Sequence, residues 1–319
     1  MEEKILKLFK KKPEHYLSVE QISKSLNITR SAFWKHIEKL RLYGYEFDAV
    51  PHLGYRLRKA PDKLYSFEIS PILKTRIIGK DIIYHDTVGS TNTIAYNLAK
   101  SGAKEGVVVV AERQTKGRGR LSRVWSSPKE KGIYLSIILR PKMTPFKAPV
   151  MTLMAAVSLA QAIRESADVQ AFIKWPNDIL INEKKVSGIL TEMDAEADFV
   201  KFLILGIGIN ANTKILDLPK GATSIAQESG VFVVRQQLVK ALLERLEQNY
   251  MLIQKEGFVP IRTQWRNLSV TLGRRVKATC MHKQIEGEAV DIEPDGALKV
   301  RLDNGFYEKV MAGDLTLLR

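Results

Sequence analysis

The sequence predicts an α+β protein built from an N-terminal winged helix-turn-helix, a central mixed sheet with packed helices, and a small C-terminal β-barrel. Residues 1–63 have a compact helical pattern that ends in a hairpin. Between residues 64 and 268, apolar strands alternate with amphipathic helices, which predicts a sheet covered by helices. In residues 269–319, short strands alternate with turns at 293–296 and 303–305, which is typical of a small barrel.

The composition argues against a secreted or membrane-spanning protein. At 319 residues the chain is long for one core, and its 45% hydrophobic and 27% charged residues are typical of soluble globular proteins. The single cysteine, Cys280, excludes an intramolecular disulfide and fits a reducing cytoplasm. The N-terminus mixes acidic with apolar residues, unlike a secretory signal. The longest apolar stretch, residues 150–163, is short for a bilayer, so we expect a buried helix in a cytoplasmic protein.

The net charge of +15 is densest near the N-terminus. Residues 1–63 hold 14 Lys and Arg against 8 Asp and Glu, a net charge of +6, whereas the other 256 residues share the remaining +9. A basic N-terminal part is expected if it meets a polyanion such as DNA.

The N-terminal part predicts three helices. Residues 2–11 place apolar side chains on one face of a first helix. Residues 18–21, Ser-Val-Glu-Gln, form a capping box that begins a short helix ending near Leu26. Thr29 then caps a third helix that ends near Leu42.

The third helix has an apolar face and a polar, basic face. Two short helices joined by a tight turn, the second basic on its free face, have helix-turn-helix geometry. We interpret the hairpin at residues 45–58 as a wing. A generic three-helix interaction module has the same pattern, but Arg56 and Arg58 in the wing favour DNA binding. The candidate DNA-binding residues are Thr29, Arg30, Ser31, Lys35, His36 and Arg56.

Residues 60–63, Ala-Pro-Asp-Lys, are interpreted as the linker to the central part. Its strand candidates are Ile82–His85, Val107–Glu112, Ile133–Leu139 and Phe202–Ile209. Its helix candidates are Asn92–Lys100, Ala148–Glu165 and Val233–Lys255.

The segment Lys116–Trp125, Lys-Gly-Arg-Gly-Arg-Leu-Ser-Arg-Val-Trp, predicts an anion-binding loop. Glycine lets an anion approach the main chain, and guanidinium groups bind phosphate or carboxylate through paired hydrogen bonds. An ordinary solvated basic turn would have the same composition, so this segment alone leaves both interpretations open.

A second segment, Lys174–Met193, predicts a hairpin with strands at 179–181 and 186–190. Lys185 lies where the second strand begins, and small residues leave space beside it. Trp175, Asn177 and Asp178 cluster where the first strand begins. A lysine, a carboxylate and an amide near residues 116–125, from here on called the Gly/Arg loop, suit a binding site for a nucleotide with a metal ion. A surface hairpin would also carry lysines at its turn, so this interpretation stays open as well.

Together, five motifs in this order resemble those of biotin protein ligases. They are Ser90-Thr91-Asn92, Gln114 to Trp125, Lys174 to Asp178, Lys185 to Leu190, and Gly206 to Asn210. The resemblance extends over roughly the whole chain, because the N-terminal part matches the family's bifunctional members. Ser122 departs from the pattern, since many relatives carry glycine there, and we expect altered loop mobility with unchanged chemistry.

The resemblance implies a class II synthetase-like biotin ligase fold in residues 64–268 and an SH3-like barrel in residues 269–319. It implies that biotin and ATP form biotinyl-5′-AMP, from which biotin passes to an acceptor lysine. It also implies repression of biotin synthesis genes, with biotinyl-5′-AMP as corepressor. Partners would be operator DNA, a second copy of the chain in an adenylate-induced homodimer, and carrier domains of acetyl-CoA carboxylase and pyruvate carboxylase.

The resemblance also assigns roles to residues. Biotin would be bound by Ser90, Thr91, Asn92, Gln114, Arg118, Gly119, Arg120 and Lys185. ATP would be bound by Arg118, Arg120, Trp125, Asn177, Asp178, Lys185 and Asn210. Lys185, Arg118, Arg120 and Asp178 would carry the chemistry, and Asp178 and Asn210 would hold Mg²⁺ through water.

Some alternatives stay open at this point. Thr91 or Asn92 could cap the helix that follows, Trp125 could be a core residue, and Gly206–Asn210 could be only a strand end. Lipoate attachment enzymes share this catalytic fold, but they have a different glycine-rich stretch in place of residues 117–120. A biotin-sensing regulator that does not ligate is the other rival, although it would not need Arg118, Arg120, Asp178 and Lys185.

Overall fold

The computed structural model describes residues 1–280, 283–311 and 313–318, and its contacts divide the chain into two units. The first unit is Met1–Pro71 and the second is Ile72–Arg319. Each unit is described by itself. The three-domain division, with boundaries at residues 63 and 268, is kept as a proposal.

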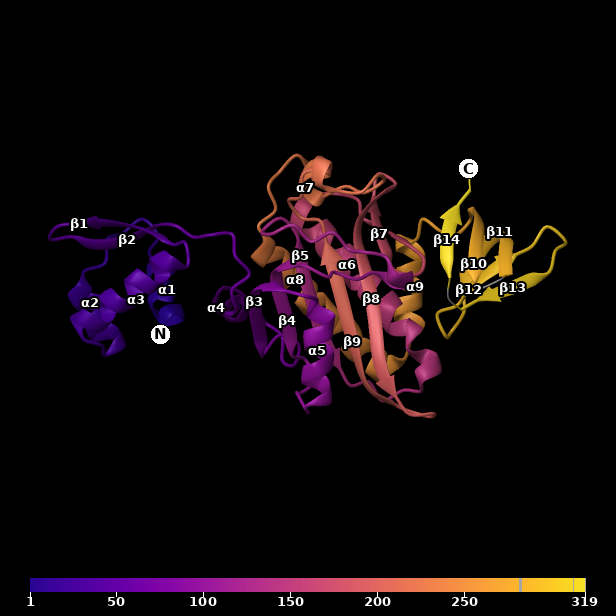
Figure 1. The fold of residues 1–319 in the computed structure, drawn as a ribbon, viewed down its shortest axis with the longest axis horizontal. Helices are drawn as coiled ribbons and strands as arrows, with labels where there is room; N and C mark the ends of the chain where they lie inside the picture. The colour runs from indigo at the N-terminus through magenta and orange to yellow at the C-terminus, as the bar shows by residue number, and fades with distance from the viewer. Residues whose placement is uncertain (281–282, 312, 319) are drawn as a thin grey trace. The chain divides into compact units, whose positions relative to one another are not determined.

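The first unit is a three-helix cluster followed by a two-stranded hairpin (Figure 1). Its elements are α1 (Glu2–Lys11), α2 (Val19–Leu26), α3 (Arg30–Leu42), β1 (Glu46–Val50), β2 (Gly54–Lys59) and the short α4 (Ser66–Ile69). The capping box is present, since Ser18 Oγ accepts from the Gln21 amide at 3.1 Å and Gln21 Oε1 accepts from the Ser18 amide at 3.2 Å. Thr29 Oγ1 accepts from the Ala32 amide at 3.1 Å. The predicted helices, caps and wing are therefore confirmed.

The chain packs onto this unit beyond the predicted linker. Glu68 in α4 is buried and accepts hydrogen bonds from the Tyr45 hydroxyl and from Lys10. Burial, and then the Glu68 carboxylate, raise the pKa of Tyr45. Leu64 and Ile69 are fully buried as well. Residues 64–69 thus complete the core of the first unit.

The second unit is built on a seven-stranded sheet with strand order β3-β4-β5-β9-β8-β7-β6. The strands are β3 (Ile82–Val88), β4 (Val108–Gln114), β5 (Ile133–Leu139), β6 (Phe172–Lys174), β7 (Asp178–Ile181), β8 (Lys184–Ala195) and β9 (Val200–Ile209). Strands β3 and β4 are parallel and the other neighbours are antiparallel, so the predicted mixed sheet is confirmed. Strand β8 extends five residues beyond the predicted end at Leu190, because β9 pairs with it along nearly its whole length.

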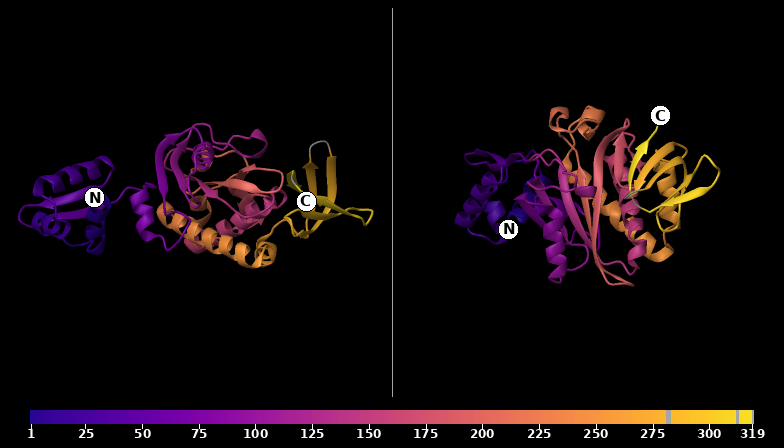
Figure 2. Two further views of the ribbon diagram at one scale, coloured as in Figure 1. Left: turned by 90° about the horizontal axis from the view of Figure 1, so that it is seen from below. Right: turned by 45° about the vertical axis from the view of Figure 1, so that its right-hand side comes forward.

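Helices cover both faces of this sheet (Figure 2). They are α5 (Thr91–Lys100), α6 (Pro149–Ala167), α7 (Ile225–Ser229), α8 (Arg235–Glu256) and α9 (Val259–Leu268). Ala95 and Ala99 of α5 pack in one cluster with Val109, Ile138 and Ile204 of the sheet. The opposite face is covered by α6, whose Thr152 hydroxyl lies 2.8 Å from that of Thr191, and α8 and α9 pack on α6.

Helix α6 is the buried helix predicted from the apolar stretch at 150–163. The span Pro145–Ala167 is long and apolar enough to cross a membrane, but 72% of its apolar window is buried inside the protein. That burial is typical of the central helix of a globular core. Helices α7 and α9 and strand β6 were not anticipated from the sequence.

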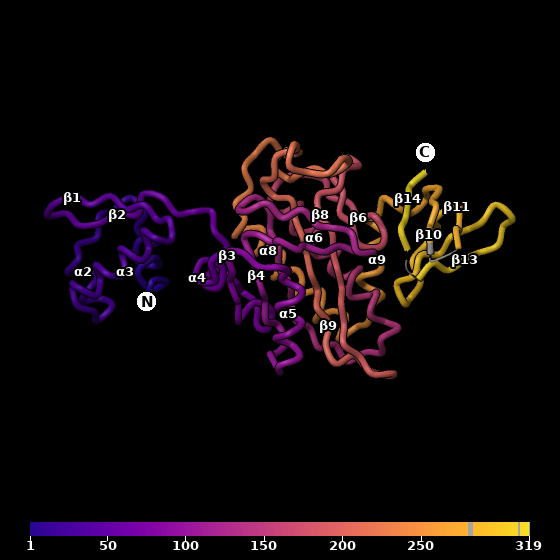
Figure 3. The backbone as a smooth tube through the Cα atoms, viewed as in Figure 1, coloured from indigo at the N-terminus to yellow at the C-terminus, as the bar shows by residue number. Residues whose placement is uncertain are grey.

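The C-terminal residues form a five-stranded antiparallel sheet with order β13-β12-β11-β10-β14 (Figure 3). Its strands are β10 (Arg275–Cys280), β11 (Lys283–Ile292), β12 (Leu298–Arg301), β13 (Tyr307–Val310) and β14 (Asp314–Leu317). The predicted turns at 293–296 and 303–305 connect β11 to β12 and β12 to β13. The β-rich C-terminal part is therefore confirmed, and its SH3-like character stays an expectation.

The packing of Glu68 predicts where the first unit can be separated from the rest of the chain. An isolated fragment 1–71 should be more stable than a fragment 1–63 by about 1–3 kcal/mol, because the shorter one leaves the buried Tyr45 hydroxyl without its acceptor. Urea unfolding of the two fragments measures the difference. Glu68→Gln in fragment 1–71 is the control, since it keeps an acceptor for Tyr45. Equal stability of the two fragments would contradict the assignment of α4 to this unit.

Candidate active site

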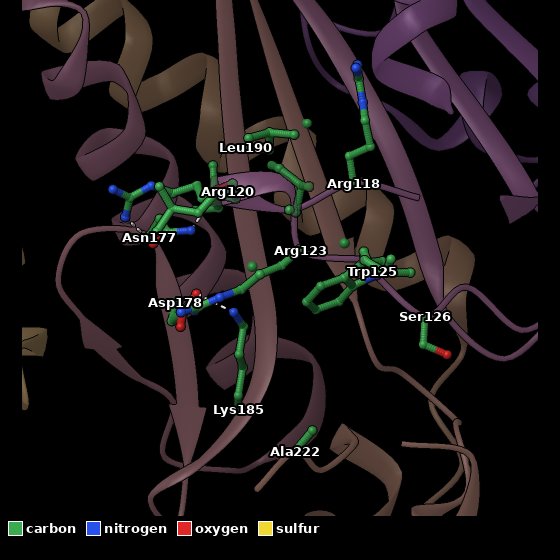
Figure 4. Close-up of a pocket in the computed structure, with 18 of the residues that line it drawn as sticks. Arg118, Arg120, Arg123, Trp125, Ser126, Asn177, Asp178, Lys185, Leu190 and Ala222 are labelled. Carbon is green, nitrogen blue, oxygen red and sulfur yellow. Dashed lines mark hydrogen bonds and ion pairs between the residues drawn. The ribbon is translucent and has the colours of Figure 1, made fainter. Parts of the chain in front are cut away.

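A pocket opens on the α5 face of the second unit's sheet, between the Gly/Arg loop and the β7–β8 hairpin (Figure 4). All the residues predicted to bind biotin or nucleotide line it: Ser90, Thr91, Asn92, Gln114, Arg118, Gly119, Arg120, Trp125, Asn177, Asp178, Lys185 and Asn210. Alternation along β8 turns Gly188, Leu190 and Glu192 toward this face, opposite Thr191 and α6. Residues from all five motifs therefore meet at one place.

One end of the pocket is a buried polar cluster. Ser136 Oγ donates to Asn92 Oδ1 at 2.6 Å and lies 2.8 Å from Thr91 Oγ1. Asn92 Nδ2 donates to Glu192 Oε2 at 2.7 Å. Gln114 Oε1 accepts from the Thr91 amide at 2.8 Å. These groups are held by one another, so their donors and acceptors have defined directions before a ligand arrives.

The expectation that Thr91 or Asn92 caps helix α5 was wrong. Ser90 occupies the N-cap position, and no side chain caps the helix there. The free amide of Thr91 instead donates to Gln114, which reaches over from the end of β4. A side chain from a neighbouring strand thus replaces the local cap, and Asn92 remains available to the pocket.

Glycines in β9 make room for this cluster and for Trp125. A Cβ atom on Gly206 would lie 2.0 Å from Asn92 Oδ1, and a Cβ on Gly208 would lie 2.5 Å from the Trp125 indole. Trp125 also lies close to Gly188 of β8. Its indole nitrogen is buried and has no hydrogen-bond partner among the described residues. Trp125 is therefore a wall of the pocket, lying flat on strands that lack side chains at that point.

Lys185 and Asp178 form an ion pair across the hairpin, with Lys185 Nζ 2.6 Å from Asp178 Oδ1 (Figure 4). The backbone of Lys185 is held from both directions, because its amide donates to Gly221 O and its carbonyl accepts from the Thr223 amide. Lys185 Nζ also lies 5.6 Å from the centroid of the Trp125 ring. The ammonium group is thus placed between a carboxylate and an aromatic wall.

The three arginines of the Gly/Arg loop each contact a different framework element. Arg118 Nη2 lies 3.1 Å from Glu192 Oε1, and its side chain points away from the Lys185–Asp178 pair (Figure 4). Arg120 donates to Asn177 Oδ1 at 3.1 Å and to the Gly313 carbonyl at 3.0 Å. Arg123 pairs with Asp314, and this hydrogen-bonded ion pair lowers the pKa of the Asp314 carboxyl. Side chains of β8, the β6–β7 connection and β14 therefore hold the loop.

The backbone of the loop has left-handed conformations at Leu121, with φ 54°, and at Ser122, with φ 57°. Residues with side chains enter this region at a cost of about 1–3 kcal/mol each, whereas glycine does so freely. Glycine, which the resemblance led us to expect at position 122, would adopt this geometry without that cost.

The two predicted metal ligands, Asp178 and Asn210, differ in the contacts that their side chains already make. Asp178 faces the pocket and is engaged by Lys185. Asn210 is buried and its Nδ2 donates to Thr223 O at 3.0 Å, so at least part of its amide holds the neighbouring loop. Among the described residues, no group of three or more His, Cys, Asp or Glu side chains could hold a metal ion. A divalent cation here would need oxygen atoms from a bound phosphate.

The predicted DNA-binding residues lie in different settings within the first unit. Arg30, Ser31 and Lys35 are exposed on α3. His36 instead faces α1, where its Nδ1 lies 3.3 Å from Glu2 Oε1, and Arg56 pairs with Asp48 at 2.7 Å. Trp34 is exposed beside Lys35 and was not singled out from the sequence.

Sequence reasoning also missed Gly313 and Asp314, which line the pocket, and Ser136 and Glu192, which hydrogen-bond to residues that line it. Glu192 had a usable signal, since it continues the i, i+2, i+4 spacing from Gly188 and Leu190. Gly313 and Asp314 had none, because nothing local in the sequence links β14 to the Gly/Arg loop.

Comparison with known proteins gives matches along the whole chain. A model of the biotin/lipoate A/B protein ligase family matches residues 84–210, an HTH domain model matches residues 2–56, and a biotin protein ligase C-terminal domain model matches residues 271–317. The bifunctional ligase/repressor BirA of Bacillus subtilis is 42% identical over 98% of this chain and 97% of its own length. That of Escherichia coli is 30% identical over 94% and 92%. A solved biotin protein ligase from Aquifex aeolicus in complex with biotin and ATP is 29% identical, with a TM-score of 0.65 over 75% of this chain and 99% of that one.

The contact at Gly206 predicts a specific cost for adding one methyl group. Gly206→Ala should lower stability by about 1–3 kcal/mol, because Asn92 must leave its hydrogen bonds to Ser136 and Glu192. Thermal unfolding of the full chain measures the change. Gly119→Ala is the matched control, since a Cβ there meets its nearest neighbour at 3.6 Å. If both variants melt like the original protein, Asn92 does not depend on this glycine.

Proposed function

The chain belongs to the biotin protein ligase family as a bifunctional ligase and repressor, and from this premise we propose how its residues divide the work. It is a biotin–[acetyl-CoA-carboxylase] ligase that uses ATP, and its N-terminal helix-turn-helix makes it a transcriptional repressor. The observation that carries the proposal is a single pocket lined by a polar cluster, an aromatic wall and several cations.

We assign the polar cluster to the ureido ring of biotin. Ser90, Thr91, Asn92 and Gln114 supply short donors and acceptors beside the sheet. The valeryl chain would then run along β8 over Gly188, so that its carboxylate approaches Lys185. Trp125 would stack against the adenine of ATP. Both ligands would fill the pocket end to end.

In the first step, a carboxylate oxygen of biotin attacks the α-phosphorus of ATP, an O–P bond forms, and pyrophosphate leaves. The carboxylate is already ionised near neutral pH, so the step needs no general base. The barrier comes from bringing one anion against another. Lys185, Arg118 and Arg120 would lower it by neutralising charge and holding the reactants in line.

Asp178 positions the Lys185 ammonium in this scheme. At 2.6 Å it fixes the direction of the lysine side chain while leaving further ammonium hydrogens for phosphate oxygens. Asp178 also suits the second step, in which the acceptor amine attacks the biotinyl carbonyl and AMP leaves, because a carboxylate can accept the proton that the amine loses.

Mg²⁺ fits this site as a companion of ATP. Asp178, with Asn210 nearby, would contribute oxygen ligands through water, and phosphate oxygens would supply the rest. The ion would neutralise part of the negative charge on the phosphates. Gly119 would let the phosphate approach the loop backbone, and Asn177 would position Arg120.

For repression, we propose that Thr29, Arg30, Ser31 and Lys35 of α3 meet operator DNA, with His36 and Arg56 supporting them. One helix-turn-helix reads a short half-site, so a homodimer induced by biotinyl-5′-AMP would supply the required specificity. We further propose that carrier domains of acetyl-CoA carboxylase and pyruvate carboxylase are the acceptors, in the cytoplasm.

Lys185→Ala should slow biotin-dependent exchange of pyrophosphate into ATP by about 100-fold or more, because the variant loses the ammonium that faces the phosphates. Lys184→Ala is the matched control, since Lys184 pairs with Glu228 outside the pocket and should keep most of the activity. Exchange at the normal rate in Lys185→Ala would refute the electrostatic role. Absence of biotin transfer by the unaltered chain to a carrier domain would refute ligation itself.

Lys35→Ala should weaken operator binding about tenfold or more near physiological salt and lower the salt dependence by about two ions, because each protomer of the proposed dimer loses one phosphate contact. Lys7→Ala on α1 is a charge-matched control and should bind operator normally. Fluorescence anisotropy at several salt concentrations gives both quantities. Equal losses in the two variants would mean that α3 has no special role.

A further inference from the structure

Glu192 contacts the polar end of the pocket and the Gly/Arg loop at the same time. Its Oε2 accepts from Asn92 Nδ2 at 2.7 Å, and its Oε1 lies 3.1 Å from Arg118 Nη2. Arg118 Nη2 also lies 3.3 Å from Oε2, so the two donors share one carboxylate. The side chain is 31% exposed, which places it at the rim of the pocket and not in the core.

The carboxylate sets the orientation of the Asn92 amide. An ionised carboxylate only accepts hydrogen bonds, so Asn92 turns its NH₂ group toward Glu192 at 2.7 Å, where the Leu190 carbonyl also accepts from it at 3.3 Å. Asn92 Oδ1 is then left to accept from the Ser136 hydroxyl, which uses that hydroxyl's one proton. The Thr91 hydroxyl, 2.8 Å from Ser136 Oγ and 3.1 Å from Gln114 Oε1, can then donate its proton to either acceptor. Glu192 therefore helps to set the donor and acceptor roles of Asn92 and Ser136.

The ion pair between Glu192 and Arg118 contributes little to stability. Arg118 is 48% exposed, and ion pairs at such positions contribute roughly 0–1 kcal/mol. A ligand carboxylate or phosphate that offers paired acceptors can displace Glu192 from the guanidinium. Arg118 is thus held near the pocket by a partner that it can exchange.

We propose that Glu192 is a positioning residue that couples recognition of the biotin ring to the state of the Gly/Arg loop. Through Asn92 it defines the hydrogen-bonding pattern offered to the ring, and through Arg118 it restrains the loop until an anionic ligand takes over. The inference rests on the proposed function of the pocket. It adds a residue of β8 that touches neither the reacting carboxylate nor the phosphates in that proposal.

The test is Glu192→Gln in the full-length protein, which keeps the size of the side chain but can donate as well as accept. The KM for biotin in pyrophosphate exchange should rise about tenfold, because the Asn92 NH₂ group loses its charged acceptor and keeps only the longer contact with the Leu190 carbonyl as a fixed acceptor. The KM for ATP should change less than the KM for biotin, since Glu192 reaches the ATP-binding residues only through its exchangeable contact with Arg118. Glu192→Ala gives the same test if the glutamine variant folds poorly.

The loop half of the proposal has its own readout, the half-life of biotinyl-5′-AMP on the enzyme. Glu192→Gln should change this half-life by about threefold in the normal protein and leave it unchanged when Arg118→Ala is already present. Glu196→Gln is the matched control, because Glu196 lies just beyond β8 and pairs with Lys201 at 2.8 Å, outside the pocket.

An unchanged KM for biotin in Glu192→Gln would overturn the inference, as would equal effects of Glu192→Gln with and without Arg118. Equal changes in the two KM values would show a merely structural role and would overturn it too. Failure of the proposed function looks different, because the unaltered protein would then show no biotin-dependent exchange at all.

Discussion

The shape of the pocket depends on three glycines in strands β8 and β9. Where β8 and β9 cross the site, Gly188, Gly206 and Gly208 present bare backbone toward the α5 face, and Asn92 and Trp125 occupy the space that their side chains would fill. The close approach brings a buried amide and an indole within reach of the same ligand. Because the contacts are as short as 2.0 Å to a hypothetical Cβ, even alanine at Gly206 forces a rearrangement. The polar cluster and the aromatic wall are therefore both consequences of the sheet.

Charge in the pocket is balanced by carboxylates from three separate strands. Asp178 on β7, Glu192 on β8 and Asp314 on β14 pair with Lys185, Arg118 and Arg123. These pairs are partly or largely exposed, so each contributes little stability and can yield to an anionic ligand. The buried pair Glu112–Arg235 differs, because both side chains are fully buried and breaking it would strand a charge in the core. The partly exposed pairs can therefore exchange partners at little cost, whereas the buried pair stabilises the fold.

The C-terminal sheet takes part in the site. The Gly313 carbonyl accepts from Arg120, and Asp314 pairs with Arg123. Two of the three loop arginines are thus held by a segment almost 200 residues away in the chain. A ligase core cut before this sheet would lose the Asp314 partner of Arg123 and the Gly313 partner of Arg120, and would keep Glu192 and Asn177 as partners of the loop arginines. This contact gives a physical reason for the C-terminal domain to accompany the catalytic sheet in one unit.

The sequence by itself determined what local chemistry controls. Periodicity and caps predicted the helices and wing of the first unit, and the five motifs predicted twelve residues that line one pocket. Tertiary structure decided what depends on distant partners. Gln114 displaces the expected helix cap because β4 ends beside α5, and β8 extends to Ala195 because β9 pairs with it. Glu192 and Asp314 enter the site, and Glu68 joins the first unit, only because folding places these carboxylates beside cations and hydroxyls far away in sequence. The strand spacing from Gly188 to Glu192 indicated only which face Glu192 occupies, and the pairings themselves leave no local pattern in the sequence.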